Sequence, residues 1–264
     1  MANKYFSNDK HRAGKVKDLF ATVAPRYDFI NDLQSFGLHR LWKAQLIRTA
    51  AVKPSDEALD VCCGTGDITL RLAAAGARAT GIDFSRPMLD VAEQRSAALP
   101  KLIRPLHFIQ GDALHLPFES ARFDIVTVSY GLRNLADFDA GLGELIRVLR
   151  PGGRLLILDF GKPAWAPWRW IYFQYLRWAC PVFGRLFCGD ADTHGYILES
   201  LKAYPAQNGV DQALEAYGFQ ERRIFNLVGG MMSLNSGSKP SARPLSKPLG
   251  NATGEISGVR ISSF

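Results

Sequence analysis

The sequence predicts an α/β fold: a doubly wound, mostly parallel sheet with a C-terminal antiparallel hairpin and a helical cover. Short apolar strands alternate with helical segments between residues 58 and 160, and this alternation is typical of a parallel sheet. The segment 123–130 is apolar at most positions, as expected for a strand with helices on both faces. Ligands of such sheets bind at the carboxyl ends of the strands.

Local signals define the elements of the N-terminal half. The amphipathic helical pattern of residues 19–49 is interrupted near 35–37. Two further helices each have a boundary residue, Gly76 after the first and Ser85 before the second. These helices cover 67–75 and 87–98, and the strands of this half cover 58–62, 78–83 and 106–110.

The C-terminal half continues the alternation and then breaks it. A helix over 137–149 stops at Pro151-Gly152-Gly153, and a strand follows over 155–160. Residues 163–204 interrupt the pattern, with nine aromatic residues between Trp165 and Phe187. The last expected elements are a helix at 211–217 and two strands at 219–227 and 231–235, which flank two glycines and indicate a hairpin.

Composition divides the chain into three parts. Residues 1–17 are expected to form a flexible basic N-terminus, and 18–238 the folded domain. Residues 239–264, rich in serine, glycine and proline, are expected to form a disordered tail. Within the domain, 163–204 is an aromatic-rich helical insertion, which we expect to lie as a lid over the ligand-binding edge.

The net charge of +7 lies at the two ends of the chain. Residues 1–17 have a surplus of four positive charges and residues 239–264 a surplus of three, so the remainder is balanced. A nucleic-acid footprint usually covers one folded face, and we therefore expect no nucleic-acid partner. The basic ends are either solvated or in contact with an anionic membrane surface.

The four cysteines indicate a reducing compartment. None forms a C-x-x-C pair and no histidines stand at ligand spacing, so no metal site is expected. No signal peptide and no uncharged apolar run of about 18 residues is found. We expect a cytoplasmic protein, with peripheral contact with the inner membrane as an alternative.

A glycine-rich turn follows the first strand. Gly64 and Gly66 let the backbone approach a ligand closely. Asp83 ends the next strand 17 residues after Gly66, where a carboxylate can accept hydrogen bonds from ribose hydroxyls. Thr69 occupies the place of the third glycine of a pyrophosphate-binding motif, and no P-loop spacing is present. These residues alone leave a dinucleotide site or a plain tight turn open.

Four motifs in order are more specific than the turn alone: D-x-x-C-G-T-G, an acid ending the second strand, G-D-A after the third, and L-R-P-G-G before the fifth. In these the sequence resembles the class I, Rossmann-like S-adenosylmethionine-dependent methyltransferases. The resemblance implies a set of cofactor-binding residues: Gly64, Thr65 and Gly66 at the methionine moiety, Asp83 at the ribose, Asp112 and Ala113 at the adenine, and Ser129 at the border of the site.

Three further segments, 19–43, 128–134 and 189–200, are similar to the C-methyltransferases of menaquinone and ubiquinone biosynthesis. This family, of the demethylmenaquinone methyltransferase type, acts on prenylated quinols. The resemblance implies methylation of demethylmenaquinol to menaquinol, or of a ubiquinone precursor. The chain departs from the family at Asn235, where a histidine is usual, and at Cys62-Cys63, which are expected to pack rather than react.

Arg133 and Asn134 follow the fourth strand and are the expected catalytic residues. Methylating a quinol carbon requires stabilisation of a phenolate-like oxygen, and Arg133 is the candidate for that task. Asn134 would position the substrate oxygen or a water that relays its proton. The alternative for Arg133 is a structural ion pair with Asp137 or Asp139.

The aromatic residues of 163–187 have two interpretations. They form either a packed core helix or an amphipathic lid that accepts a polyprenyl tail at a membrane surface, where Arg169, Arg177 and Arg185 would meet head groups. Among the histidines, only His39 lies in a family segment and is worth testing.

Two other functions stay open at this point. One is a methyltransferase of another small molecule, such as a sterol or a phospholipid amine. The other is a non-enzymatic cofactor-binding protein. The oligomeric state is not indicated by the sequence.

Overall fold

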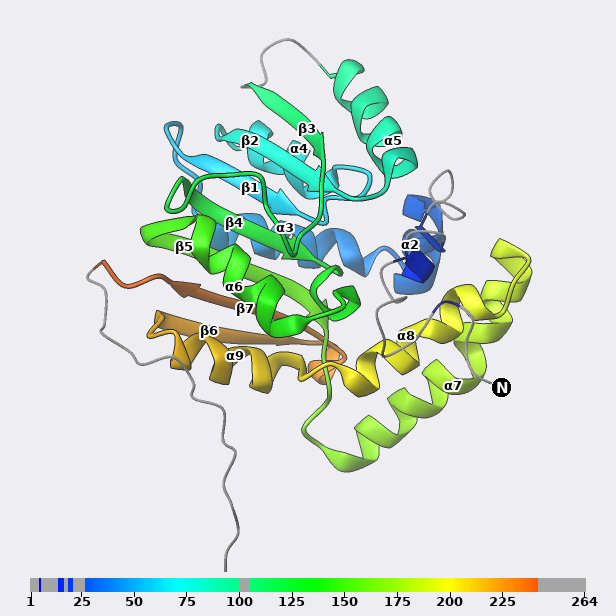
Figure 1. The fold of residues 1–264 in the computed structure, drawn as a ribbon. Helices are drawn as coiled ribbons and strands as arrows, with labels where there is room; N and C mark the ends of the chain where they lie inside the picture. Colours follow the sequence, from blue (N-terminus) through cyan, green and yellow to red (C-terminus); the bar gives the residue numbers. More distant parts are fainter. Residues whose placement is uncertain (1–4, 6–13, 17–18, 21–26, 100–104, 242–264) are drawn as a thin grey trace, which may run out of the picture.

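The computed structural model describes residues 5, 14–16, 19–20, 27–99 and 105–241. In this part of the chain, seven strands form one sheet in the order β3-β2-β1-β4-β5-β7-β6 (Figure 1). Strand pairs from β3 to β5 are parallel, whereas β7 runs antiparallel to β5 and β6. The predicted sheet and hairpin are therefore confirmed. The strands are β1 (Glu57–Val61), β2 (Arg78–Asp83), β3 (Leu106–Gln110), β4 (Phe123–Ser129), β5 (Leu149–Phe160), β6 (Gln220–Leu227) and β7 (Met232–Ser238).

Helices cover both faces of the sheet. Helices α3 and α4 pack on one face, α5 lies on that same face beside β3, and α6 and α9 contribute to the core on the other (Figure 1). The helices are α2 (Tyr27–Ser35), α3 (Leu38–Ala50), α4 (Asp67–Ala74), α5 (Arg86–Ala97), α6 (Phe138–Val148), α7 (Ala166–Cys188), α8 (Asp192–Ala203) and α9 (Ala206–Ala216), with the short 3₁₀ turns η2 (Leu132–Asn134) and η3 (Val228–Gly230).

Alternate residues of the central strands enter two separate cores, because successive side chains of a strand point to opposite faces. Leu59 of β1 and its partner Val126 of β4 lie in the core shared with α6 and α9. Their neighbours Ala58 and Ile125 lie in the core shared with α3 and α4. Burial on both faces explains why β4 is mostly apolar.

The strand order reverses between β1 and β4, from which β2 and β3 extend to one side and β5 to the other. A reversal of this kind leaves a crevice at the carboxyl ends of the strands. Helices α2, α7 and α8 lie beyond that edge (Figure 1). The insertion 163–204 thus forms a helical pair next to the crevice, and its role as a lid stays a prediction.

Several boundaries differ from the sequence prediction. The strand expected at 155–160 begins at Leu149, because left-handed Gly152, with φ of 76°, lets the extended chain pass through the glycines, and its N–H donates to the carbonyl of Lys239 at 2.8 Å. The helix expected at 211 begins at Ala206, and β7 continues to Ser238 because its pairing with β5 extends that far.

The interruption expected near 35–37 is confirmed. Phe36 and Gly37 have left-handed φ values of 50° and 73° between α2 and α3. At the other end of the domain, the N–H of Lys239 donates to the carbonyl of Gly153 at 2.8 Å, so the sheet reaches this residue. The predicted tail beyond 241 and most of the predicted flexible N-terminus lie outside the described residues. No described helix is long and apolar enough to cross a membrane.

Asp60 of β1 ties three elements together. Its two carboxylate oxygens accept hydrogen bonds from the hydroxyls of Thr69 in α4 and Thr127 in β4, both at 2.8 Å. Burial raises the pKa of Asp60 to about 7, although the two hydroxyls lower it in part. The folded state therefore holds the Asp60 proton more tightly than the unfolded state does.

The stability of the protein should accordingly depend on pH through Asp60. A raised folded-state pKa contributes stability that is full below a pH of about 4 and is lost as the pH rises to about 7. Relative to Asp60→Asn, the free energy of unfolding of the wild type should fall by roughly 4 kcal/mol across this window, as measured by urea denaturation. Asp90→Asn, on the exposed side of α5, is the matched control. A difference that does not change with pH would contradict the prediction.

Candidate active site

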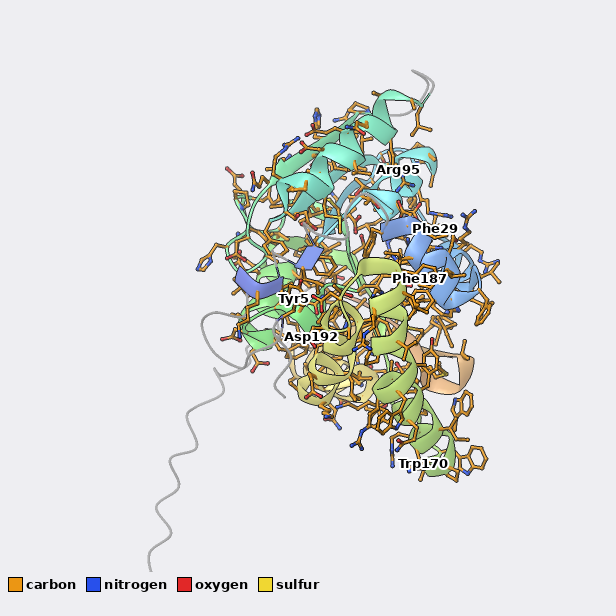
Figure 2. The ribbon with its side chains drawn as sticks, turned by 90° about the vertical axis from the view of Figure 1, so that its right-hand side faces the viewer. Tyr5, Phe29, Arg95, Trp170, Phe187 and Asp192 are labelled. Carbon is orange, nitrogen blue, oxygen red and sulfur yellow. The ribbon has the colours of Figure 1, made fainter. Side chains whose placement is uncertain are left out.

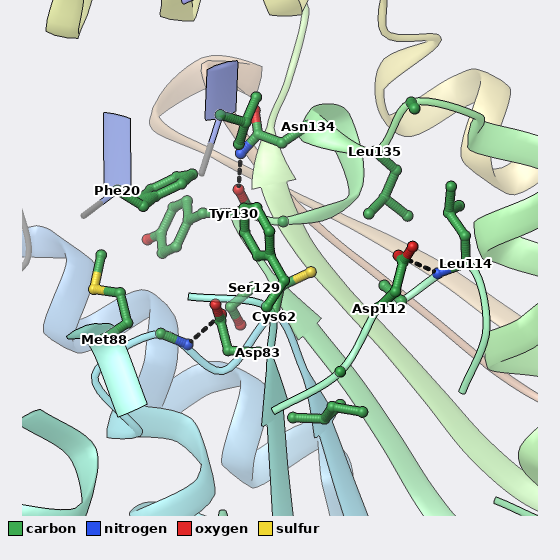
Figure 3. A pocket seen from close by; sticks show the side chains of 18 of the residues that line it. Phe20, Cys62, Asp83, Met88, Asp112, Leu114, Ser129, Tyr130, Asn134 and Leu135 are labelled. Atoms are coloured by element: carbon green, nitrogen blue, oxygen red, sulfur yellow. Dashed lines mark hydrogen bonds between the residues drawn. The ribbon is translucent and has the colours of Figure 1, made fainter. Parts of the chain in front are cut away.

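Two adjoining cavities lie at the carboxyl ends of the strands. The first, here the inner cavity, has a volume of about 750 Å³ and is lined by residues that follow β1, β2, β3 and β4 (Figure 3). The second, here the outer cavity, has a volume of about 1640 Å³ and is lined mainly by α2, α3, α7 and α8. Phe20, Tyr27 and Tyr130 line both and form the partition between them.

Asp83 is the acidic group of the inner cavity. Its carboxylate accepts hydrogen bonds from the N–H groups of Gly64 and Ser85, both at 2.9 Å. Burial raises its pKa, because these N–H groups only partly replace water. A carboxylate oxygen has a second lone pair, so Asp83 can accept further hydrogen bonds from a ligand with hydroxyl groups.

In the glycine-rich turn, one residue lines the inner cavity and two determine the conformation and packing of the turn. Gly64 lines the inner cavity, whereas Thr65 and Gly66 do not. A Cβ at Gly66 would lie 2.8 Å from the Phe108 ring, and its φ is 78°, so this position requires glycine for packing and for conformation. The sequence therefore predicted the turn, but two of its three residues act on the turn itself.

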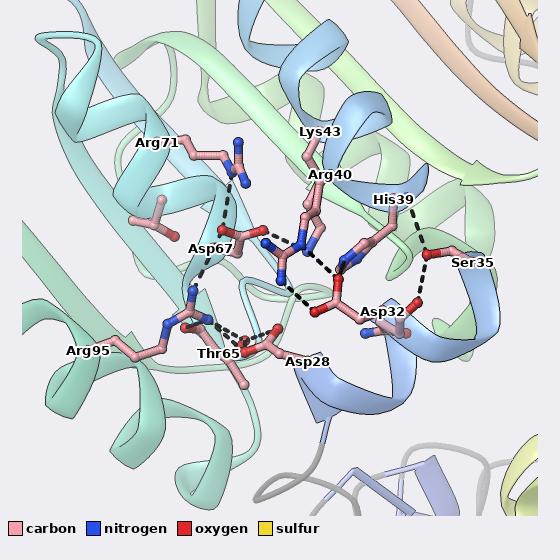
Figure 4. Close-up of polar contacts among 12 residues, drawn as sticks. Asp28, Asp32, Ser35, His39, Arg40, Lys43, Thr65, Asp67, Arg71 and Arg95 are labelled. Carbon is pink, nitrogen blue, oxygen red and sulfur yellow. Dashed lines mark hydrogen bonds and ion pairs between the residues drawn. The ribbon is translucent and has the colours of Figure 1, made fainter. Parts of the chain in front are cut away.

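Thr65 joins the turn to α2. Its hydroxyl lies 3.1 and 3.2 Å from the carboxylate oxygens of Asp28 and 3.1 Å from the guanidinium of Arg95 (Figure 4). Arg95 also pairs with Asp28 at 2.8 Å. The helix that walls the outer cavity is thereby attached to the turn that walls the inner one.

The remaining predicted cofactor residues all line the inner cavity. Asp112 and Ala113 follow β3, and an Asp112 oxygen accepts a hydrogen bond from the N–H of Leu114 at 2.9 Å. Ser129 ends β4, and its hydroxyl is buried with no hydrogen-bond partner in the described part of the chain. A buried hydroxyl of this kind is suited to a polar ligand atom.

The two predicted catalytic residues lie on different sides of the partition. Arg133 lines the outer cavity and Asn134 the inner one. Asn134 donates from Nδ2 to the carbonyl of Tyr130 at 3.0 Å, and its Oδ1 is buried without a partner among the described residues. The structure thus brings both side chains to the junction, but not to one surface.

Arg133 is held by a buried ion pair with Asp159, at 3.1 Å from Nη1 to Oδ1. The alternative of a pair with Asp137 or Asp139 is wrong about the partner, since Asp137 caps α6 by accepting from the N–H of Ala140. No motif in the sequence indicated Asp159, because the end of β5 meets η2 only in the folded sheet.

The charge of Arg133 persists in spite of its burial. Burial by itself lowers the pKa of the guanidinium, but the charge interactions with Tyr196 and Asp159 outweigh it, so the pKa is raised. Nη2 donates to the hydroxyl of Tyr196 in α8 at 2.8 Å. The wall of the apolar outer cavity therefore contains a permanent cation.

His39 also lines the outer cavity. Its Nε2 lies 2.7 Å from an Asp32 oxygen, and burial lowers its pKa (Figure 4). By contrast, Asn235 lines neither cavity and donates to the carbonyl of Gln207 at 2.8 Å. The asparagine at the usual histidine position therefore joins β7 to α9 and lies away from the site.

Cys62 and Cys63 are packing residues, as expected. Burial raises the pKa of both thiols, which disfavours the reactive thiolate. Within the described residues, these cysteines and Cys180 form no disulfide, and no cluster of three metal-ligating side chains occurs.

Tyr27 and Tyr130 are the site residues that the sequence reasoning missed. Both lie within segments that carried the family resemblance, but no role was predicted for either. The left-handed φ of 60° at Tyr130 is a signal of function only once the backbone is known.

The family model that matches residues 7–239 is described as the ubiE/COQ5 methyltransferase family. The chain belongs to this family. The demethylmenaquinone methyltransferase of Desulfitobacterium hafniense is 38% identical over 235 residues, which cover 88% of this chain and 92% of the relative. The ubiquinone/menaquinone biosynthesis C-methyltransferase UbiE of Vibrio vulnificus is 36% identical over 233 residues, which cover 87% of this chain and 89% of the relative.

Solved structures support the fold of this methyltransferase. An S-adenosylmethionine-dependent methyltransferase from Thermotoga maritima is similar with a TM-score of 0.56 at 16% identity, covering 84% of this chain and 99% of that chain. The class I, Rossmann-like fold predicted from the motifs is confirmed by this likeness.

The inner cavity fits the family's cofactor, S-adenosylmethionine. Asp83 offers acceptor oxygens for ribose hydroxyls, and the unpartnered hydroxyl of Ser129 offers a further polar contact. Gly64, with φ of 55°, has no atom near the place of a Cβ, so the backbone is open to a ligand.

Proposed function

We propose that this methyltransferase transfers a methyl group from S-adenosylmethionine to a ring carbon of a prenylated quinol, converting demethylmenaquinol to menaquinol. A ubiquinone-type quinol is the second candidate. The observation that carries the proposal is the pair of cavities: one that contains the Asp83 carboxylate at the strand ends meets a larger, mostly apolar one, with a buried cation at the junction. The names of the relatives support the substrate class.

The roles of the inner-cavity residues follow from their positions. Asp83 would accept from the ribose hydroxyls, Asp112 and Ala113 would flank the adenine, and Ser129 would border the methionine moiety. Gly64 would let the methionine moiety lie against the backbone, while Thr65 and Gly66 shape the turn. When bound, S-adenosylmethionine supplies an electrophilic methyl group.

The chain's own residues must prepare the acceptor. A quinol carbon becomes strongly nucleophilic when a ring hydroxyl loses its proton, so the site must hold the resulting oxyanion and align the carbon with the methyl group. Arg133 would hold that oxygen, because it is the cation of the outer cavity and stays charged. Asn134, whose Oδ1 is unpartnered among the described residues, would position the oxygen or a water that accepts the proton.

The prenyl tail would occupy the outer cavity and leave by its mouth. Ile171, Tyr175 and Phe36 line this cavity and are also 49%, 41% and 89% exposed, so the cavity opens onto an apolar surface. On α7 that surface continues with Trp170 and Trp178, which are 64% and 66% exposed. Figure 2 shows Trp170 at the outer margin of the molecule.

Charge identifies the partner of this surface. Helix α7 contains three arginines, at 169, 177 and 185, and no acidic residue. Tryptophan and arginine together are typical of helices that lie in the interface of an anionic bilayer. We therefore infer peripheral contact with an anionic membrane, through which the lipid-soluble quinol would enter.

Asp83→Ala should weaken cofactor binding, because it removes the acceptor of the ribose hydroxyls. Unsatisfied polar groups cost roughly 1–3 kcal/mol, so the affinity for S-adenosylmethionine should fall about 5- to 150-fold by calorimetry. Asp90→Ala on the exposed side of α5 is the matched control. Unchanged affinity in a folded Asp83 variant would remove this residue from the cofactor site.

Purified wild-type protein should methylate demethylmenaquinol, and Arg133→Lys should lower turnover per folded molecule with little change in cofactor affinity. The lysine ammonium is a point charge and cannot reproduce the paired N–H donors of the planar arginine guanidinium. Donors to a developing oxyanion contribute on the order of 3 kcal/mol, or about a hundredfold in rate. Arg133→Ala should also lower the melting temperature, because it leaves Asp159 buried without its cation.

Arg147→Lys is the matched control, since Arg147 makes several contacts but lines neither cavity. It should lower stability and leave turnover unchanged. If Arg133→Lys behaves in the same way, Arg133 is structural. Methylation of a sterol or phospholipid amine instead of the quinol, or cofactor binding without turnover, would contradict the proposed function.

The membrane contact predicts binding to vesicles. Wild-type protein should sediment with vesicles that contain phosphatidylglycerol, and less with phosphatidylcholine alone. The double variant Trp170→Ser, Trp178→Ser should bind at least about tenfold more weakly, since each buried indole contributes more than about 1.5 kcal/mol. The control variant Leu99→Ser, Tyr217→Ser alters exposed apolar residues away from the cavity mouth. Equal loss in both variants would contradict the proposed surface.

A further inference from the structure

Tyr130 is the first residue after β4 and lies in the partition between the two cavities (Figure 3). Its φ of 60° is in the left-handed region, which is unfavourable for a residue with a Cβ. Its carbonyl accepts hydrogen bonds from Nη1 of Arg133 at 2.6 Å and Nδ2 of Asn134 at 3.0 Å. The unusual backbone thus positions both proposed catalytic side chains.

The side chain of Tyr130 carries a second cost. Its hydroxyl is buried and has no hydrogen-bond partner in the part of the chain that the structure describes, and a buried polar group without a partner is destabilising. Phenylalanine would fill the same space without that cost, and the ring would keep its edge-to-face contact with Phe160 at 6.1 Å. Two unfavourable features at one residue of a site indicate a function that needs them.

We propose that the Tyr130 hydroxyl donates a hydrogen bond to the ring oxygen of the quinol next to the carbon that receives the methyl group. This inference rests on the proposed function. Because Tyr130 faces both cavities, only the reacting end of the acceptor reaches it, whereas the tail lies in the outer cavity. Arg133 would supply charge to the same oxygen, and Tyr130 a directed neutral donor.

The protonation state of Tyr130 suits this role. Burial raises the pKa of the phenol well above its usual value, so it keeps its proton and acts as a donor. Tyr27 is the other tyrosine of the partition, and burial raises the pKa of its phenol as well. Of the two hydroxyls, that of Tyr130 is the one buried without a hydrogen-bond partner among the described residues.

Tyr130→Phe tests the inference, because it removes the hydroxyl and keeps the ring. With demethylmenaquinol as acceptor, kcat/KM should fall about 10- to 100-fold, mostly in kcat, since hydrogen bonds to charged groups contribute about 1.5–3 kcal/mol. The Kd for S-adenosylmethionine, from calorimetry, should stay unchanged. The melting temperature should stay the same or rise, because an unsatisfied group is lost. Tyr204→Phe, at a buried tyrosine that lines neither cavity, is the matched control and should leave kcat/KM unchanged.

The outcomes separate this inference from the proposed function. If the wild type methylates the quinol and Tyr130→Phe is equally fast, the role of Tyr130 is overturned and the function stands. Weaker binding of S-adenosylmethionine by the variant would also overturn it, by assigning the hydroxyl to the cofactor. If the wild type methylates no prenylated quinol, the proposed function is overturned and the Tyr130 inference with it.

Discussion

The buried ion pair between Arg133 and Asp159 joins the parts of the site. Asp159 accepts from the backbone N–H of Arg133 at 3.2 Å as well as from its guanidinium, so it fixes η2 against the end of β5. The guanidinium also lies over the rings of Phe160 and Tyr196, at 4.6 and 5.6 Å. One cation therefore connects the turn after β4, the end of β5 and helix α8. Removing one partner of a buried ion pair typically costs about 3–5 kcal/mol. The pair therefore holds η2, the end of β5 and α8 in fixed positions between the two cavities.

The cavities differ in the way that the two reactants of the proposed reaction differ. The carboxylate of Asp83 and the hydroxyl of Ser129 face the inner cavity, whereas mostly apolar side chains of α2, α3, α7 and α8 surround the larger outer one. A charged, water-soluble donor needs such polar partners, because burying polar groups without them is unfavourable, whereas a prenyl tail needs none. The three aromatic side chains of the partition allow both environments to meet where the methyl group must pass.

Charged contacts attach the helical cover to the glycine-rich turn. Asp28 of α2 contacts Thr65 and Arg95, and Lys43 of α3 pairs with Asp67 at 2.8 Å, directly after the turn (Figure 4). The side chain of Lys43 is only 5% exposed, so this pair is shielded from solvent. Helices α2 and α3, whose other residues line the outer cavity, are therefore linked to the glycine-rich turn by one hydroxyl–carboxylate hydrogen bond and two ion pairs, which gives the cover a defined position over the strand ends.

The sequence by itself determined the sheet, its hairpin and most of the inner-cavity lining that was predicted for the cofactor, although Thr65 and Gly66 lie outside that lining. Strand and helix alternation reflects burial on both faces, and an aspartate at a strand end such as Asp83 reaches the ligand edge in any parallel sheet. The sequence also selected Arg133, because its motif is local. Only the tertiary structure decided the rest. The partner of Arg133 is 26 residues away in the chain, and its choice of Asp159 over Asp137 depends on how β5 lies beside β4. The separation of Arg133 and Asn134 by the partition, and the strained position of Tyr130, depend on backbone angles after β4 that residue types do not specify.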